Sequence, residues 1–267
     1  MTARLRSPSA VCFALDSLPP VPVLAGAAVS HEDLVLEAPD GNRLAAFAAL
    51  SDERPLLRAG VVVLPDVRGL YRFYEELALR FAERGYAAVA IDYFGRTAGV
   101  AKRDDDFGFM DHVTRTTGDG IQADVAAAVA HLRSPAGGSC TSVFTVGFCF
   151  GGRQAWLSTA GGHGLAGAIG FYGRPGLGRD GSPGPVQRAR ELQGPILALM
   201  GGADQAISPT DIAELEQALS DAGVEHEVVT YEGAPHSFFD RKYEEFAEAS
   251  EDAWTRVLAF LERHAIT

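Results

Sequence analysis

Short apolar runs recur along the chain, spaced so that a helix fits between them. Several are continuous and bounded by turn-forming residues, as expected of strands buried on both faces of a sheet. The predicted strands are residues 60–64, 86–91, 143–148, 165–172, 195–200 and 224–231. Because these strands alternate with longer segments, the pattern predicts an α/β fold with a mostly parallel central sheet and helices on both faces.

Between the predicted strands, apolar residues recur at helical spacing. The segment 208–223 begins with Ser208 before Pro209, a favoured pair for a helix start, and ends at Gly223. Further helices are expected at residues 73–84, 120–133 and 249–264.

The beginning of the chain has a different pattern. Residues 1–30 are proline-rich, which predicts an irregular N-terminal arm that lies over the domain or is mobile. The tripeptide at 39–41, Pro-Asp-Gly, separates two β-like runs and predicts an N-terminal antiparallel hairpin at one edge of the sheet. Because the chain has 267 residues and 47% hydrophobic content, residues 31–267 can form one domain.

Charge and cysteine content limit the function. A formal net charge of −12 argues against nucleic-acid binding, which needs a basic surface. Cys12, Cys140 and Cys149 have neither paired nor metal-ligand spacing, so we expect no disulfide framework and no metal site, and a cytoplasmic location fits best. No apolar stretch is long enough to cross a bilayer, and prolines interrupt the short apolar run near the N-terminus. We therefore expect a soluble protein without a membrane span or an export signal.

One predicted strand ends in Gly-Phe-Cys-Phe-Gly-Gly, residues 147–152, and a helix-compatible segment follows directly. A strand, a sharp turn and a helix in this order form a nucleophile elbow, whose apex, here Cys149, has a strained backbone that neighbouring glycines help to accommodate. At a helix N-terminus, the dipole and the free N–H groups favour a thiolate. The alternative is a buried structural cysteine beside a tight turn.

Two more polar residues follow predicted strands. Asp204 comes soon after residues 195–200, and His236 soon after residues 224–231. Ligands of open α/β sheets bind beyond the carboxyl ends of the strands. Alone, Asp204 also fits a turn cap and His236 a backbone-bonded loop histidine. Together with Cys149 they follow the order of the α/β-hydrolase triad, in which the histidine takes the thiol proton and the aspartate fixes its tautomer.

These motifs resemble those of the dienelactone hydrolase family. The resemblance extends from about residue 30 to the C-terminus and rests on residues 64–70, 92–96, 147–152, 202–204 and 233–238. It implies an α/β-hydrolase fold and hydrolysis of the ester bond of small carboxylated lactones. The implied route is a Cys149–His236–Asp204 triad with an acyl-enzyme intermediate and no cofactor.

The resemblance also assigns roles beside the nucleophile. One backbone N–H of the oxyanion hole comes from Phe150, the residue after the nucleophile, and the second is assigned to Val67. Asp66 matches an acidic residue, usually glutamate, that hydrogen-bonds the resting thiol and helps to form the thiolate. Because aspartate is one methylene shorter, Asp66 either takes part in thiol activation or only structures its loop.

A carboxylate on the substrate needs a positive anchor in this acidic protein. Arg96 matches one anchor of the family, and its planar guanidinium can hold a carboxylate through two hydrogen bonds. The second family anchor lies four residues after the histidine, where this chain has Asp240. Arg241 is therefore either a shifted replacement or a surface residue. Further candidates to line the cleft are Tyr93, Arg68, Arg72 and Arg174, for which core or solvated surface positions are the alternatives.

Two other interpretations remain open. The same triad could serve an esterase or thioesterase with another small acyl substrate, because the fold hosts many chemistries. The domain could also be a non-catalytic binding or thiol-sensing module in which Cys149 is modified without turnover. Asp204 and His236 weigh against a sensor, since a sensor needs no acid–base relay. The sequence leaves the oligomeric state open and allows a homodimer.

Overall fold

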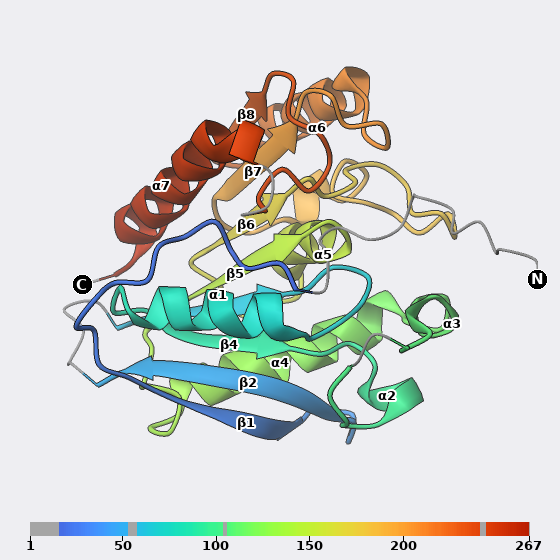
Figure 1. The fold of residues 1–267 in the computed structure, drawn as a ribbon. Helices are drawn as coiled ribbons and strands as arrows, with labels where there is room; N and C mark the ends of the chain where they lie inside the picture. Colours follow the sequence, from blue (N-terminus) through green and yellow to red (C-terminus); the bar gives the residue numbers. More distant parts are fainter. Residues whose placement is uncertain (1–15, 53–57, 104–105, 241–243, 267) are drawn as a thin grey trace, which may run out of the picture.

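The computed structural model describes residues 16–52, 58–103, 106–240 and 244–266. In this part of the chain, an eight-stranded sheet forms the centre of the molecule, in the spatial order β1-β2-β4-β3-β5-β6-β7-β8 (Figure 1). The strands are β1 (Val29–Glu37), β2 (Arg43–Ser51), β3 (Ala59–Leu64), β4 (Ala87–Ile91), β5 (Ser142–Phe148), β6 (Gly167–Phe171), β7 (Ile196–Gly201) and β8 (His226–Tyr231). β3 to β8 run parallel, and β1 and β2 form the predicted antiparallel hairpin at one edge.

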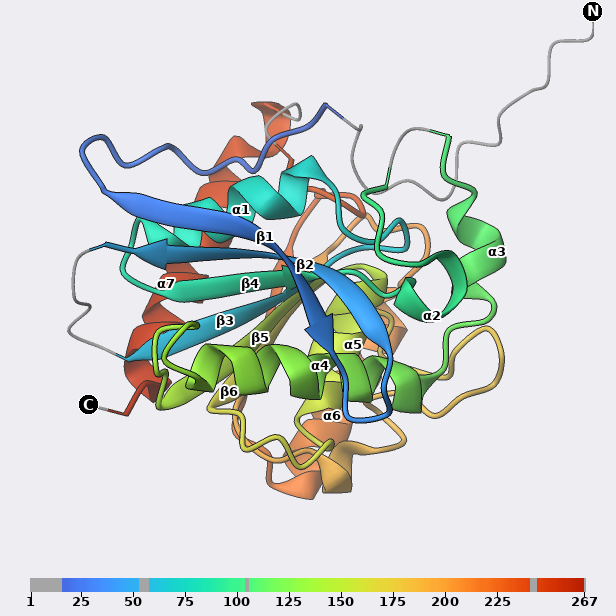
Figure 2. The same ribbon diagram turned by 90° about the horizontal axis from the view of Figure 1, so that it is seen from below.

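Helices cover both faces of the sheet. α1 (Arg72–Ala82) and α7 (Ala247–His264) pack on one face, while α4 (Gly118–Arg133), α5 (Phe150–Ser158) and α6 (Pro209–Ala222) pack on the other (Figure 2). The shorter helices are α2 (Gly95–Ala98), α3 (Phe109–Val113), η1 (Ala189–Glu191) and η2 (Glu244–Phe246). The predicted α/β architecture is confirmed.

The local sequence explains why these elements form where they do. Every residue of β3 is buried, as its unbroken apolar run predicts, because this strand lies in the middle of the sheet. α6 begins with a capping box, in which the Ser208 hydroxyl accepts from the Asp211 N–H and the Asp211 carboxylate accepts from the Ser208 N–H. It ends at Gly223, whose φ of 69° is the left-handed conformation that glycine adopts most readily. α2 and α3 are not among the predicted helices, because helices of one turn carry no periodic signal in the sequence.

The described part of the N-terminal arm, from Asp16 onwards, is irregular and packs on the domain. It lies over α1 (Figure 1), where the Arg84 guanidinium donates to the Pro22 carbonyl. Val21 is buried in the main core, and the buried Ser17 hydroxyl donates to Asp240 at 2.7 Å. Cys12 lies outside the described residues. In the described part of the chain, no helix is both long and apolar enough to span a membrane.

Candidate active site

Cys149 occupies a sharp turn between β5 and α5. Its φ of 55° and ψ of −113° place it in a region that residues with side chains rarely adopt, at a cost of about 1–3 kcal/mol. Hydrogen bonds hold the turn: the Cys149 N–H donates to the Phe171 carbonyl at 3.0 Å, and the Cys149 carbonyl accepts from the Arg153 N–H at 3.3 Å. The geometry is that of the predicted elbow.

Three glycines make this turn possible because backbone passes directly beside each of them. A Cβ on Gly147 would lie 2.0 Å from the Gly151 carbonyl oxygen, and one on Gly151 would lie 2.1 Å from the Leu64 oxygen. A Cβ on Gly152 would meet the Phe171 oxygen at 2.6 Å. Since atoms do not approach this closely without a bond, a side chain at any of these positions would force the elbow apart.

The structure brings Cys149, Asp204 and His236 together from the carboxyl ends of β5, β7 and β8. The His236 Nδ1–H donates to the Asp204 Oδ2 at 2.6 Å, and His236 also hydrogen-bonds Cys149. The second oxygen of Asp204 accepts from the Ala206 N–H at 2.7 Å. Because Asp204 engages Nδ1, the imidazole is fixed with Nε2 available to the thiol.

The environment of His236 favours its protonated form. Burial by itself lowers the pKa of His236, but the hydrogen bonds to Asp204 and Cys149 and the charges of both groups outweigh burial and raise the pKa to about 10. An imidazolium beside the sulfur stabilises a thiolate, which is the nucleophilic form of cysteine. The arrangement therefore provides a nucleophile in Cys149 and, in His236, a group that can donate its proton to a leaving group.

The two backbone donors assigned to the oxyanion hole follow β5 and β3. Phe150 is the first residue of α5, and Val67 follows β3, whose end packs against Gly151. Neither the Phe150 N–H nor the Val67 N–H has a hydrogen-bond acceptor among the described residues. Neither N–H group is therefore committed to another acceptor, and their role as oxyanion donors stays a prediction.

Asp66 is fully buried and tied to its own loop. Its carboxylate forms an ion pair with Arg68, with 2.8 Å between the Arg68 Nη2 and the Asp66 Oδ2, and accepts from the Tyr71 hydroxyl at 3.2 Å. Burial lowers the pKa of Arg68, but the Asp66 charge outweighs burial and raises it. These contacts support the loop-structuring role of Asp66.

Tyr93 is buried beside the elbow. Its hydroxyl donates to the Pro65 carbonyl at 2.9 Å, and its ring packs edge-on against Phe150. Burial, followed by the negative charges of Asp66, Asp92 and Cys149 among others, raises the pKa of Tyr93 well above its ordinary value, so the hydroxyl stays protonated. Tyr93 thus fastens the loop of Asp66 and Val67 to the start of α5.

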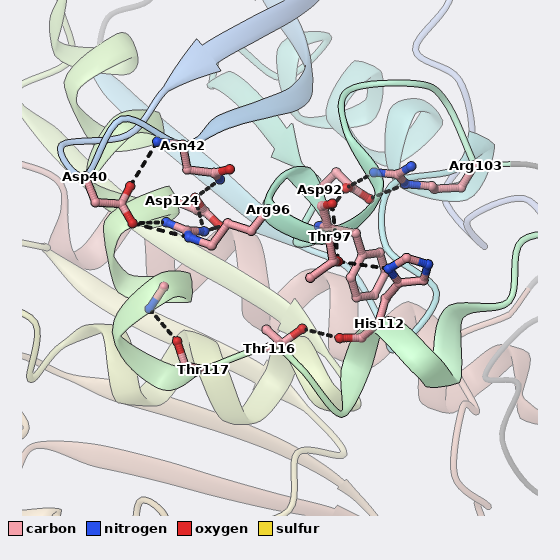
Figure 3. Close-up of polar contacts among 12 residues, drawn as sticks. Asp40, Asn42, Asp92, Arg96, Thr97, Arg103, His112, Thr116, Thr117 and Asp124 are labelled. Atoms are coloured by element: carbon pink, nitrogen blue, oxygen red, sulfur yellow. Dashed lines mark hydrogen bonds and ion pairs between the residues drawn. The ribbon is translucent and has the colours of Figure 1, made fainter.

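Arg96 already has two carboxylate partners within the protein (Figure 3). Its Nη1 lies 2.7 Å from the Asp124 Oδ2, and its Nη2 lies 2.6 Å from the Asp40 Oδ2. Asn42 completes the group by donating to Asp124 at 2.9 Å. The pairs join the turn between β1 and β2 to α4, so a substrate carboxylate at Arg96 would compete with Asp40 and Asp124.

We expect Arg96→Ala to lower the free energy of unfolding by about 3 kcal/mol, because removing one partner leaves a buried charge uncompensated. The charge concerned is that of Asp124, whose side chain is 1% exposed. Among the described residues it would keep only the Asn42 amide as a side-chain partner. Denaturant unfolding measures the change. Arg188→Ala, which breaks an exposed pair with Glu191, is the matched control and should cost under about 1 kcal/mol. Equal losses in both variants would contradict the structural role of Arg96.

The remaining predicted residues are placed as follows. Arg241 lies outside the described residues, while Asp240 is buried and accepts from Ser17. Arg72 is exposed and faces Glu76, and Arg174 is partly buried near Asp204. Tyr172 is not among the predicted site residues, although its ring packs against His236 with 4.9 Å between the centroids. Its position at the carboxyl end of a predicted strand was the available signal.

Comparisons with known proteins show which family the chain is similar to. A model described as "Dienelactone hydrolase family" matches residues 44–265. A protein of Yersinia pestis, named "Putative carboxymethylenebutenolidase", is 29% identical over 85% of this chain and 86% of its own length. A protein of the same name from Salmonella typhimurium is 31% identical over 76% of this chain and 77% of its own length. Among solved structures, one titled "Putative Dienelactone Hydrolase", from Klebsiella pneumoniae, is 26% identical with a TM-score of 0.77, covering 88% of this chain and 99% of that one.

Proposed function

Because the chain belongs to the dienelactone hydrolase family, we propose that it hydrolyses the ester bond of small lactones through Cys149, His236 and Asp204. One observation carries the proposal. The thiol, the imidazole and the carboxylate form a continuous hydrogen-bonded chain at the carboxyl edge of the sheet. A structural cysteine or a loop histidine would not need both of the other two residues.

In the first half of the reaction, the Cys149 thiolate attacks the carbonyl carbon of the lactone. The carbonyl oxygen becomes negative and is held by the N–H groups of Val67 and Phe150. When the ring C–O bond breaks, His236 gives its proton to the leaving oxygen, which stays tethered to the acyl group because the substrate is cyclic. A thioester at Cys149 results.

In the second half, His236 is neutral and can take a proton from water. The resulting hydroxide attacks the thioester carbon, the C–S bond breaks, and the hydroxy acid leaves while Cys149 returns to the thiolate. Asp204 acts in both halves by holding the imidazole in one tautomer and by stabilising the imidazolium. The residues supply the nucleophile, the acid–base group and the charge stabilisation.

The contacts of Arg96 favour a second candidate, an esterase for acyl substrates without a carboxylate. A guanidinium paired with Asp40 and Asp124 is a weaker anchor than an uncommitted one. The KM of Arg96→Ala decides between the candidates. If Arg96 binds a substrate carboxylate, the KM of the Arg96→Ala variant rises far more for a carboxylated lactone than for a neutral ester.

The test of the proposed function is the loss of ultraviolet absorbance when purified protein is added to a dienelactone, with a p-nitrophenyl ester measured in parallel. We expect turnover of at least one of them, with the acyl group found on Cys149 by mass spectrometry after rapid acid quenching. Turnover without an acyl group on Cys149 would contradict the mechanism. Turnover of neither compound, with Cys149 still readily alkylated, would contradict the substrate class.

A further inference from the structure

Arg153 is a buried cation surrounded by backbone carbonyl groups. It lies on α5, four residues after Cys149, and its guanidinium donates to the carbonyl oxygens of Arg174, Gly176, Ser182 and Pro183. Three of these oxygens belong to residues 176–183, which follow β6 without regular secondary structure. Burial lowers the pKa of Arg153, and the nearby Asp180 opposes this effect. Arg153 therefore fixes the loop 174–183 against the helix that carries the nucleophile.

Arg174, at the start of this loop, connects it to the catalytic acid. The Arg174 Nη2 donates to the Ala206 carbonyl at 3.2 Å. The N–H of the same Ala206 donates to the Asp204 Oδ1 at 2.7 Å, and the Asp204 Oδ2 accepts from His236. The backbone of Ala206 thus contacts both residues: its carbonyl accepts from Arg174, and its N–H donates to the Asp204 carboxylate.

These contacts form a closed ring around the site. It runs from Cys149 along α5 to Arg153, through the loop to Arg174, and then to Ala206, Asp204 and His236, which returns to Cys149. We propose that Arg174 is a positioning residue that orients Asp204 through Ala206, and that Arg153 holds Arg174 in place. The proposal deepens the proposed function, since it rests on Asp204 and His236 acting on Cys149.

The surroundings of Arg174 fit positioning. Gly173, the residue before Arg174, packs against the backbone of Gly152. A Cβ on Gly173 would lie 2.5 Å from the Arg153 backbone nitrogen. The loop therefore has little freedom at this point. On the other side, Ser208 hydrogen bonds lower the pKa of Asp211, and the charge of Arg174 lowers it further, so the guanidinium lies near the start of α6. The backbone beside Arg174 is thus held against α5, and its guanidinium lies near the loop that carries Asp204.

The first test measures the rate at which iodoacetamide alkylates Cys149 at neutral pH, followed on the peptide that contains this residue. Arg174→Ala should slow alkylation about fivefold, the effect of losing one ordinary hydrogen bond, because a loosened Asp204 lets the imidazolium turn away from the sulfur and weakens the hydrogen bond that stabilises the thiolate. Arg174→Lys should restore part of the rate, since an ammonium can still donate to Ala206. Arg179→Ala, which removes an exposed arginine from the same loop, is the control and should leave the rate unchanged.

A double-mutant cycle shows whether Arg174 acts through Asp204. In an Asp204→Asn background, Arg174→Ala should change the alkylation rate by less than about twofold, because the group it orients has gone. The same fivefold effect in both backgrounds would overturn the proposal, as would equal effects of Arg174→Ala and Arg179→Ala. Alkylation needs no substrate, so this result is independent of whether a lactone is turned over.

A spectroscopic signature tests the same link directly. The proton of the His236–Asp204 hydrogen bond should give a low-field proton resonance, which Arg174→Ala should shift or broaden and Arg179→Ala should not. Arg153→Lys should act like Arg174→Ala, since one ammonium cannot meet four separate carbonyl groups. An unchanged resonance in both Arg153→Lys and Arg174→Ala, with a folded protein, would overturn the positioning role.

Discussion

Replacing Cys149 by serine or alanine will reduce ester turnover by at least about 10³-fold, while the protein keeps its fold. Alanine retains the Cβ, so the strained backbone with its φ of 55° is no worse than in the native chain. Serine keeps a nucleophilic atom, but a hydroxyl is a much weaker acid than a thiol. His236 can stabilise the thiolate of Cys149 but cannot keep a serine hydroxyl ionised. The measurements are kcat/KM for an ester or lactone, together with thermal unfolding of both variants.

Cys140 provides the matched control for this prediction. It is buried and away from the triad, and burial raises the pKa of its thiol to about 11, so it stays a neutral thiol. Cys140→Ala should therefore keep native turnover. If Cys149→Ala kept most of its activity, Cys149 would not be the nucleophile.

The parts of the fold that could be predicted are those in which local sequence and global position agree. The run that became β3 is apolar throughout, and only a central parallel strand needs this pattern. The catalytic candidates could be found because parallel strands all end at one edge of the sheet. Three polar residues that each follow such a strand are brought together by topology alone, and the structure places Asp204 and His236 within 2.6 Å.

Side-chain pairing between distant segments could not be predicted. Arg96 has the residue type and the place of an anchor, but its nearest carboxylates come from the turn at Asp40 and from Asp124 on α4. Nothing in the local sequence shows that this hairpin turn folds down beside α2. The Ser17–Asp240 hydrogen bond joins residues 223 positions apart, and the contact depends on how the irregular arm crosses the domain. Such pairs depend on packing, which periodicity does not encode.

Asp204→Asn will lower kcat by about 10³-fold or more and will move the alkaline limit of activity to lower pH. The amide N–H₂ of the asparagine can donate to the His236 Nδ1. The neutral imidazole would then carry its own proton on Nε2, the nitrogen that faces the thiol. The neutral imidazole would then be in the wrong tautomer to take the thiol proton. Loss of the carboxylate charge also removes a cause of the raised His236 pKa.

The direction of the pH effect follows from His236. Its pKa is raised from the ordinary 6.5 to about 10, so the interactions that hold its proton stabilise the folded protein fully below pH 6.5, and this stabilisation is lost as pH rises through about 10. In Asp204→Asn the folded-state pKa of His236 falls. The pH range over which this stabilisation is lost, between the ordinary pKa and the folded-state pKa, therefore has an upper limit at lower pH. The pH dependence of Cys149 alkylation and of thermal unfolding measures this range. An unchanged alkaline limit would mean that Cys149 alone, and not Asp204, holds the proton on His236, and the orienting role would then have to be assigned to another group.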